Sequence, residues 1–95
     1  MNLSSLGFFR SLRKDNHQFA VIGLGRFGRA VCSTLHRLGY EVLATDIDEK
    51  NVNQVMGEHI AAHAVQLDST NSVALKEAGI YEFDTVIVAI GNYIQ

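Results

Sequence analysis

The stretch that decides the fold is Phe19-Ala20-Val21-Ile22-Gly23-Leu24-Gly25-Arg26-Phe27-Gly28, in which a short apolar run leads into three glycines with GxGxxG spacing. The apolar run is typical of a strand buried on both faces of a parallel sheet. The residues after the glycines repeat apolar side chains at helical spacing. A strand that passes through such a glycine turn into a helix forms a cradle for phosphate groups. Since glycine spacings also recur by chance, a second signal is needed.

The second signal is Asp46, which ends the next apolar run, residues 41–46. An acidic residue about 20 residues after the glycines accepts hydrogen bonds from the 2′- and 3′-hydroxyls of a ribose. Its carboxylate repels a 2′-phosphate, and Asp46 is followed by Ile47 and Asp48 rather than by a basic residue. We therefore expect an adenine nucleotide other than NADP. The alternative is a glycine-rich turn in an α/β protein that binds no nucleotide.

Each part of the glycine turn has a predicted role. Gly23 permits the tight turn, Gly25 lets the backbone approach a pyrophosphate, and Gly28 allows the helix to pack closely on the sheet. Arg26 begins the helix, where a cation opposes the helix dipole unless an anion compensates it. A guanidinium there suits terminal phosphates, which favours ADP or ATP over NAD. The alternative is a solvated arginine.

The rest of the sequence repeats the strand and helix pattern. We expect a helix over residues 26–38, a helix ending at Gly57, a strand over 63–66, a helix running to Ala78, and a strand over 85–90. The predicted fold class is α/β, a Rossmann-like doubly wound parallel sheet with the order β-α-β-α-β-α-β. The ligand crevice of such a sheet lies at the carboxyl ends of the strands.

The apolar faces of the first two helices are also predicted. Phe27, Val31, Leu35 and Leu38 form the expected inward stripe of the first helix, with Cys32 as a packed core thiol. Val52, Val55 and Met56 form that of the second. Asp48 and Glu49 are expected at the start of the second helix, and Asp68-Ser69-Thr70 forms a polar turn with candidate caps for the third.

Composition narrows the function. The 95 residues carry a net charge of −2 and a single cysteine, which fits one small domain without internal disulfides and argues against nucleic acid as the main partner. His59 and His63 are four apart, but a strand is predicted to begin at His63, so no metal site is expected. We find no catalytic constellation and expect no enzyme.

The two ends of the chain differ from the middle. Residues 1–17 interleave leucine and phenylalanine with basic residues, which predicts either a helix that docks on a membrane surface or partner, or a frayed extension. No helical segment follows the last predicted strand, whose apolar surface would lack cover. We therefore expect either a piece of a longer chain or a second copy that covers this edge.

With these residues in place, the sequence from Gln18 to Gln95 resembles the N-terminal domain of the RCK/KTN family, the cytosolic regulatory domain of potassium channels and Ktr/Trk transporters. The segments that carry the resemblance are Gln18 to Gly28, Glu41 to Asp46, Asp68-Ser69-Thr70, Glu77-Ala78-Gly79-Ile80 and Val86 to Gly91. Residues 1–17 fall outside it. The resemblance is strongest to KtrA-type subunits. It implies a nucleotide-binding domain over residues 18–95, and in the family this domain continues beyond the matching segment.

The resemblance implies a nucleotide-sensing subunit that gates a membrane potassium-translocating partner. The implied ligands are ATP or ADP, with NAD or NADH as further candidates. The implied assembly is a homo-oligomer built from dimers, which forms an octameric ring in the full-length protein. The implied location is cytoplasmic, at the inner face of the membrane. The implied binding residues are Gly23, Leu24, Gly25, Arg26, Phe27, Gly28, Asp46, Ile47, Asp48, Asp68, Ser69, Ala89, Ile90 and Gly91. Where many relatives carry an amide or alanine, this chain has Asp68 and Ser69.

Two other functions fit the same glycine turn. One is the N-terminal part of an NAD-dependent dehydrogenase, because the fold alone does not fix the function. The other is part of a redox-sensing, NADH-binding repressor, which would need a DNA-binding domain that these residues do not contain. Arg26 inside the turn and Asp68-Ser69-Thr70 after the third strand favour the nucleotide sensor over both.

Overall fold

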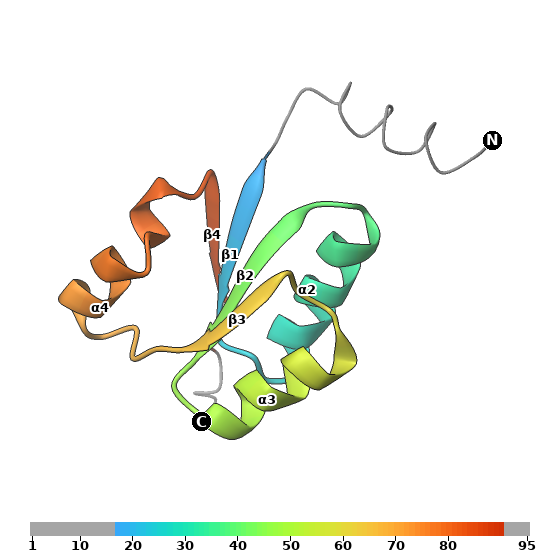
Figure 1. The fold of residues 1–95 in the computed structure, drawn as a ribbon, viewed down its shortest axis with the longest axis horizontal. Helices are drawn as coiled ribbons and strands as arrows, with labels where there is room; N and C mark the ends of the chain where they lie inside the picture. The colour runs from blue at the N-terminus through green and yellow to red at the C-terminus, as the bar shows by residue number, and fades with distance from the viewer. Residues whose placement is uncertain (1–16, 91–95) are drawn as a thin grey trace.

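The computed structural model describes residues 17–90, which form a four-stranded parallel sheet with helices on both sides (Figure 1). The strands are β1 (Gln18–Ile22), β2 (Glu41–Asp46), β3 (His63–Gln66) and β4 (Thr85–Val88). The helices are α2 (Arg26–Arg37), α3 (Glu49–Glu58), α4 (Ser72–Glu77) and the short 3₁₀ helix η1 (Ile80–Glu82). The strand order is β3-β2-β1-β4, with β1 paired in parallel to β2 and β4. The predicted fold class is confirmed.

The two faces of the sheet carry separate apolar clusters. Figure 1 shows α2 and α3 on one side of the sheet and α4 on the other. Neighbouring residues of a strand point to opposite faces, so Val21 packs in the cluster beneath α2 and α3 while Ala20 packs with Ile80 of η1. The first cluster is the larger and includes Val42, Val55 and the thiol of Cys32. This core fixes α2 and α3 on the sheet.

Part of the predicted inward stripe of α2 is wrong. Val31 and Leu35 pack against the core as expected, but Phe27 and Leu38 are 65% and 53% exposed. The residues of α2 that are fully buried are Gly28 and Cys32, because the helix approaches the sheet most closely along that line. Burial raises the pKa of the Cys32 thiol to about 11, so this cysteine is a core residue, as predicted.

Predictions for α3 were also partly wrong. Val52 and Val55 are buried, but Met56 is 54% exposed because it lies beyond the line along which α3 meets the sheet. Gly57 does not end the helix, which continues to Glu58, and His59 adopts the left-handed conformation at φ 56°. The His59 N–H group donates to the Met56 carbonyl, which closes the last turn without glycine.

The remaining helix ends match the sequence more closely. Gly39 and Gly79 have positive φ values of 92° and 75° after α2 and α4, as predicted for helix ends. The cap of α4 is Asn71, whose side chain accepts hydrogen bonds from the Val73 and Ala74 N–H groups. Asp68 does not cap this helix because it is engaged in its own turn with Thr70.

The last strand is incompletely covered on the face that carries α4. Val86 lies opposite Ala20 in the register with β1, yet it is 38% exposed, and Val88 is 65% exposed. The expected lack of cover is therefore present in the described part of the chain. The predicted docking helix within residues 1–17 lies almost wholly outside the described residues, and Gly91 also lies outside them. None of the described helices has the length and apolarity needed to cross a bilayer.

Candidate functional site

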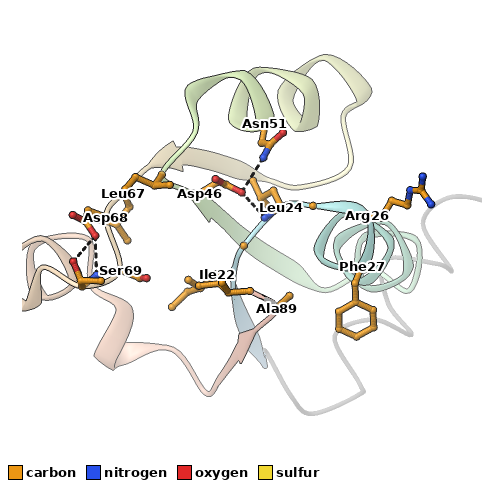
Figure 2. A pocket seen from close by; sticks show the side chains of 15 residues that line it. Ile22, Leu24, Arg26, Phe27, Asp46, Asn51, Leu67, Asp68, Ser69 and Ala89 are labelled. Atoms are coloured by element: carbon orange, nitrogen blue, oxygen red, sulfur yellow. Dashed lines mark hydrogen bonds between the residues drawn. The ribbon is translucent and has the colours of Figure 1, made fainter. Parts of the chain in front are cut away.

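A cavity of about 670 Å³ lies at the carboxyl ends of the strands (Figure 2). Its volume is within the range of small-molecule sites, and its position is where ligands bind open α/β sheets. Four loops contribute to the walls, one after each strand. The lining residues are Ile22, Gly23, Leu24, Gly25, Arg26, Phe27, Asp46, Ile47, Asn51, Leu67, Asp68, Ser69, Thr70, Ala89 and Ile90.

The glycine turn is packed so closely that two of its positions exclude a side chain. Gly23 has φ +106°, and a Cβ atom on it would lie 2.8 Å from the carbonyl oxygen of Ala89. A Cβ atom on Gly28 would lie 1.7 Å from the carbonyl oxygen of Gly23. The Gly23 N–H group donates to the Thr45 carbonyl at 2.8 Å, which ties the turn to β2. Gly23 and Gly28 thus hold the end of β1 against the start of α2.

The N-terminus of α2 presents backbone donors without a side-chain cap. Gly25 is the N-cap residue, and no described atom would lie within 4 Å of a Cβ atom placed on it, its chain neighbours aside. The first turn of this helix, described in full, contains no acidic residue. Since Gly25, Arg26 and Phe27 line the cavity, the positive end of the helix dipole adjoins it. This arrangement suits a bound anion.

Asp46 occupies the centre of the site, and three donors hold its carboxylate. Oδ2 accepts the Leu24 N–H group at 2.7 Å and the Asn51 Nδ2 group at 3.2 Å, both drawn in Figure 2. Oδ1 accepts the Asp48 N–H group at 2.8 Å. The half-buried carboxylate is thereby fixed beside the glycine turn. An oriented carboxylate of this kind accepts hydrogen bonds from sugar hydroxyls.

The loops after β2 and β3 form the other end of the cavity. The Gln66 side chain donates to the Ile47 carbonyl at 3.0 Å, which links the two loops. Asp68 Oδ1 accepts the Thr70 hydroxyl at 2.6 Å and the Thr70 N–H group at 2.9 Å. These two hydrogen bonds hold the pKa of Asp68 below its usual range. Apolar Ile47 and Leu67 beside this turn give a surface that suits a flat ring.

Charge is divided between the ends of the cavity. Figure 2 shows Arg26 and Phe27 at the end opposite Asp68 and Ser69, with Asp46 between them. Arg26 is the one cationic side chain among the described lining residues, and it is exposed. A ligand that is anionic at one end and carries a sugar in the middle therefore matches the order of groups along the cavity. The described residues contain no group of three or more metal-ligating side chains.

Most of the predicted site residues come together in this cavity. Those that line it are Gly23, Leu24, Gly25, Arg26, Phe27, Asp46, Ile47, Asp68, Ser69, Ala89 and Ile90. Gly28 is buried beneath the turn, and Asp48 caps α3, accepting from the Lys50 N–H group at 2.9 Å instead of lining the cavity. Sequence reasoning missed Ile22, Asn51, Leu67 and Thr70. Asn51 carried one usable signal, a polar side chain in the first turn of the helix that follows Asp46.

The fold and the site together define a Rossmann-like α/β domain with a glycine turn and a strand-end carboxylate in one cavity. Residues 19–95 match the TrkA-N domain, and the chain belongs to the TrkA-N domain family. This finding agrees with the resemblance drawn from the sequence motifs.

Three curated relatives share this region. The chain is 53% identical over 83 residues to Ktr system potassium uptake protein A of Bacillus subtilis (strain 168), covering 87% of this chain and 36% of that protein. It is 55% identical over 78 residues to protein C of the same system and organism, covering 82% and 34%. It is 40% identical over 80 residues to protein A of Vibrio alginolyticus, covering 84% and 36%. The chain thus spans about a third of each relative.

A solved structure shares the fold at low sequence identity. It is the prephenate dehydrogenase from A. aeolicus in complex with hydroxyphenyl propionate and NAD+, with a TM-score of 0.59 and 15% identity. The match covers 76% of this chain and 23% of that one. At this identity the likeness supports the Rossmann-like fold alone.

Proposed function

We propose that this chain is the nucleotide-sensing domain of a regulatory component of a Ktr-type potassium uptake system, with ATP or ADP as its ligands. The observation that carries the proposal is the pairing, in one cavity, of the oriented Asp46 carboxylate with the uncapped N-terminus of α2. Sequence identities of 53% and 55% to two Ktr system potassium uptake proteins support the assignment of the domain to a Ktr-type system.

In the proposed complex each part of the nucleotide meets a matching group. The ribose hydroxyls donate to Asp46, and the phosphates accept from the backbone of the glycine turn. The base lies beside Ile47, at the end formed by the loop of Asp68 and Ser69. The terminal phosphates then lie at the end of the cavity that Arg26 lines.

Regulation requires that ATP and ADP favour different states of the assembly. A ligand that binds two conformations equally shifts neither, whatever its affinity. The third phosphate of ATP is the chemical difference between the two nucleotides, and a guanidinium forks onto phosphate oxygens. We assign the contact with this third phosphate to Arg26, whose side chain is exposed. In this proposal the full protein forms a homo-oligomeric ring. The ring transmits the difference between its ATP-bound and ADP-bound states to a membrane potassium-translocating subunit at the cytoplasmic face.

The test is calorimetric titration with ATP, ADP, AMP, NAD, NADH and NADPH, repeated with Arg26→Ala. Arg37→Ala, at the opposite end of α2, is the matched control. A hydrogen bond to a charged group contributes about 1.5 kcal/mol at the lower end of its range, so Arg26→Ala should weaken ATP about tenfold and ADP much less. Arg37→Ala should change neither. An unchanged ratio of ATP to ADP affinity removes Arg26 from the mechanism.

The same titration separates this function from a second candidate, the N-terminal part of an NAD-dependent dehydrogenase. The observation that favours the second candidate is that Asp46 and the glycine turn suit the adenosine half of NAD as well as they suit ATP. Preference for NAD or NADH, together with no binding of ATP, would replace the sensor with this alternative.

A further inference from the structure

The hydrogen-bonding capacity of Asp46 is nearly filled by the protein itself. A carboxylate has about four acceptor positions on its two oxygens. Leu24 and Asn51 donate to Oδ2 and Asp48 donates to Oδ1, so three of these positions are taken. A ribose diol brings two hydroxyl donors. The carboxylate therefore accepts both hydroxyls only if one of the three protein donors withdraws.

The three donors differ in how freely they can withdraw. The donors of Leu24 and Asp48 are backbone N–H groups, at 2.7 and 2.8 Å, and they are fixed by the glycine turn and by the start of α3. Asn51 donates from a side-chain amide, and its distance of 3.2 Å is the longest of the three. A longer hydrogen bond from a rotatable side chain is the one that exchanges most readily.

The withdrawn amide would remain next to the hydroxyl that replaces it. Asn51 is half-buried and lines the cavity from α3, and Figure 2 shows its side chain directed at Asp46 beside the Leu24 backbone. A hydroxyl that donates to Oδ2 from this side has lone pairs that the Asn51 amide can reach as a donor. Since an amide is neutral, it offers no charge compensation to a 2′-phosphate next to Asp46.

We propose that Asn51 is a ribose-selecting residue, which donates to Asp46 Oδ2 before the nucleotide binds and then passes that acceptor to the ribose 2′-hydroxyl while donating to the hydroxyl oxygen. The inference rests on the proposed function, because it assigns the sugar of the nucleotide bound there. It adds to the site a residue that the motif of three glycines and one acid does not contain.

The test compares ATP with 2′-deoxy-ATP on the wild-type chain, Asn51→Ala and Asn53→Ala. Asn53 is the matched control, because it is the same residue type on the same helix, exposed, and does not line the cavity. Loss of one neutral hydrogen bond corresponds to about a 2- to 10-fold change in affinity. Asn51→Ala should weaken ATP by this factor and leave 2′-deoxy-ATP within about twofold of its wild-type value. Asn53→Ala should change neither nucleotide.

The selectivity ratio distinguishes recognition from a structural role. If Asn51→Ala weakens both nucleotides by the same factor, or weakens neither, the inference is overturned while the proposed function stands. If the wild-type chain binds neither nucleotide, both are overturned together. Thermal unfolding without nucleotide checks that each variant is folded. Asn51→Ser keeps a shorter donor, so its ratio of ATP to 2′-deoxy-ATP affinity should fall between those of wild type and Asn51→Ala.

Discussion

The N-termini of α2 and α3 lie near each other on the same side of the sheet, yet only α3 has a side-chain N-cap. At α3 the Asp48 carboxylate accepts the Lys50 N–H group at 2.9 Å, and Glu49 adds an acid to the first turn. At α2 the N-cap is Gly25, without a side chain, and the described first turn has no acid. The helix that lacks a cap lines the cavity with its N-cap residue and its first two residues, whereas the first turn of α3 contributes only the Asn51 side chain. The missing stabilisation therefore marks the site.

The energetic meaning of this difference is direct. A side-chain cap contributes about 1 kcal/mol to a helix, and acids in the first turn contribute further through the helix dipole. The third helix is also capped, by Asn71, with two hydrogen bonds. In α2 the donors that a cap would satisfy are left for another acceptor. Under the proposed function that acceptor is the phosphate of the nucleotide.

The largest expected effect comes from closing the glycine turn itself. Gly28→Ala places a Cβ atom 1.7 Å from the Gly23 carbonyl oxygen, so the end of β1 and the start of α2 must separate. We expect a loss of about 3 kcal/mol in the free energy of unfolding, measured by urea denaturation, and loss of ATP binding. Unchanged stability would mean that the close approach of these two segments is not needed.

Gly57→Ala is the matched control for that substitution. It lies in α3, where no described atom would be within 4 Å of the new Cβ atom, chain neighbours and local helix backbone aside. Removing a glycine from a helix stabilises it by up to about 1 kcal/mol. The two glycine-to-alanine changes should therefore have opposite signs, which separates close packing from helix propensity.

A second experiment gives α2 the cap that α3 already has. Gly25 has φ −74° and ψ −163°, which an N-cap aspartate adopts without strain, and there is open space at its Cβ position. Gly25→Asp should raise the stability of the nucleotide-free chain by a few tenths of a kcal/mol as a cap, because glycine is itself tolerated at an N-cap, and by about 0.3–1 kcal/mol through the helix dipole. It should weaken ATP more than about tenfold, because the new carboxylate takes the donors and repels phosphate. Thermal unfolding with and without ATP measures both effects. Tighter ATP binding would contradict the assignment of these donors to phosphate.

The sequence allowed the fold to be predicted because its signals are local. Apolar strands, the glycine turn and the helix ends at Gly39 and Gly79 each depend on a few neighbouring residues. The face that a helix turns to the sheet depends on how closely the two pack. That distance is set by Gly28, which is why Phe27 and Leu38 were wrongly placed inside.

The site was predictable only where its residues follow a rule of sequence spacing. The three glycines and Asp46 follow a spacing rule, and the structure brings Gly23, Gly25 and Asp46 into one cavity. Asn51 follows no spacing rule, because only the path of the chain from β2 into α3 brings its amide to Asp46. Asp48 was expected at the start of the second helix from its position and among the binding residues from the resemblance. Its carboxylate caps the helix, as expected, and does not line the cavity.

The smallest effect tests this last distinction between a site residue and a cap. Asp48→Ala removes the cap of α3 but keeps the Asp48 N–H group that donates to Asp46 Oδ1. Loss of an N-cap should lower the free energy of unfolding by about 1 kcal/mol, measured by urea denaturation. The ATP dissociation constant should stay within about twofold of wild type, since the side chain does not line the cavity. A large loss of affinity with little loss of stability would return Asp48 to the binding site. It would also mean that α3 contributes its cap residue, and not only Asn51, to the ligand.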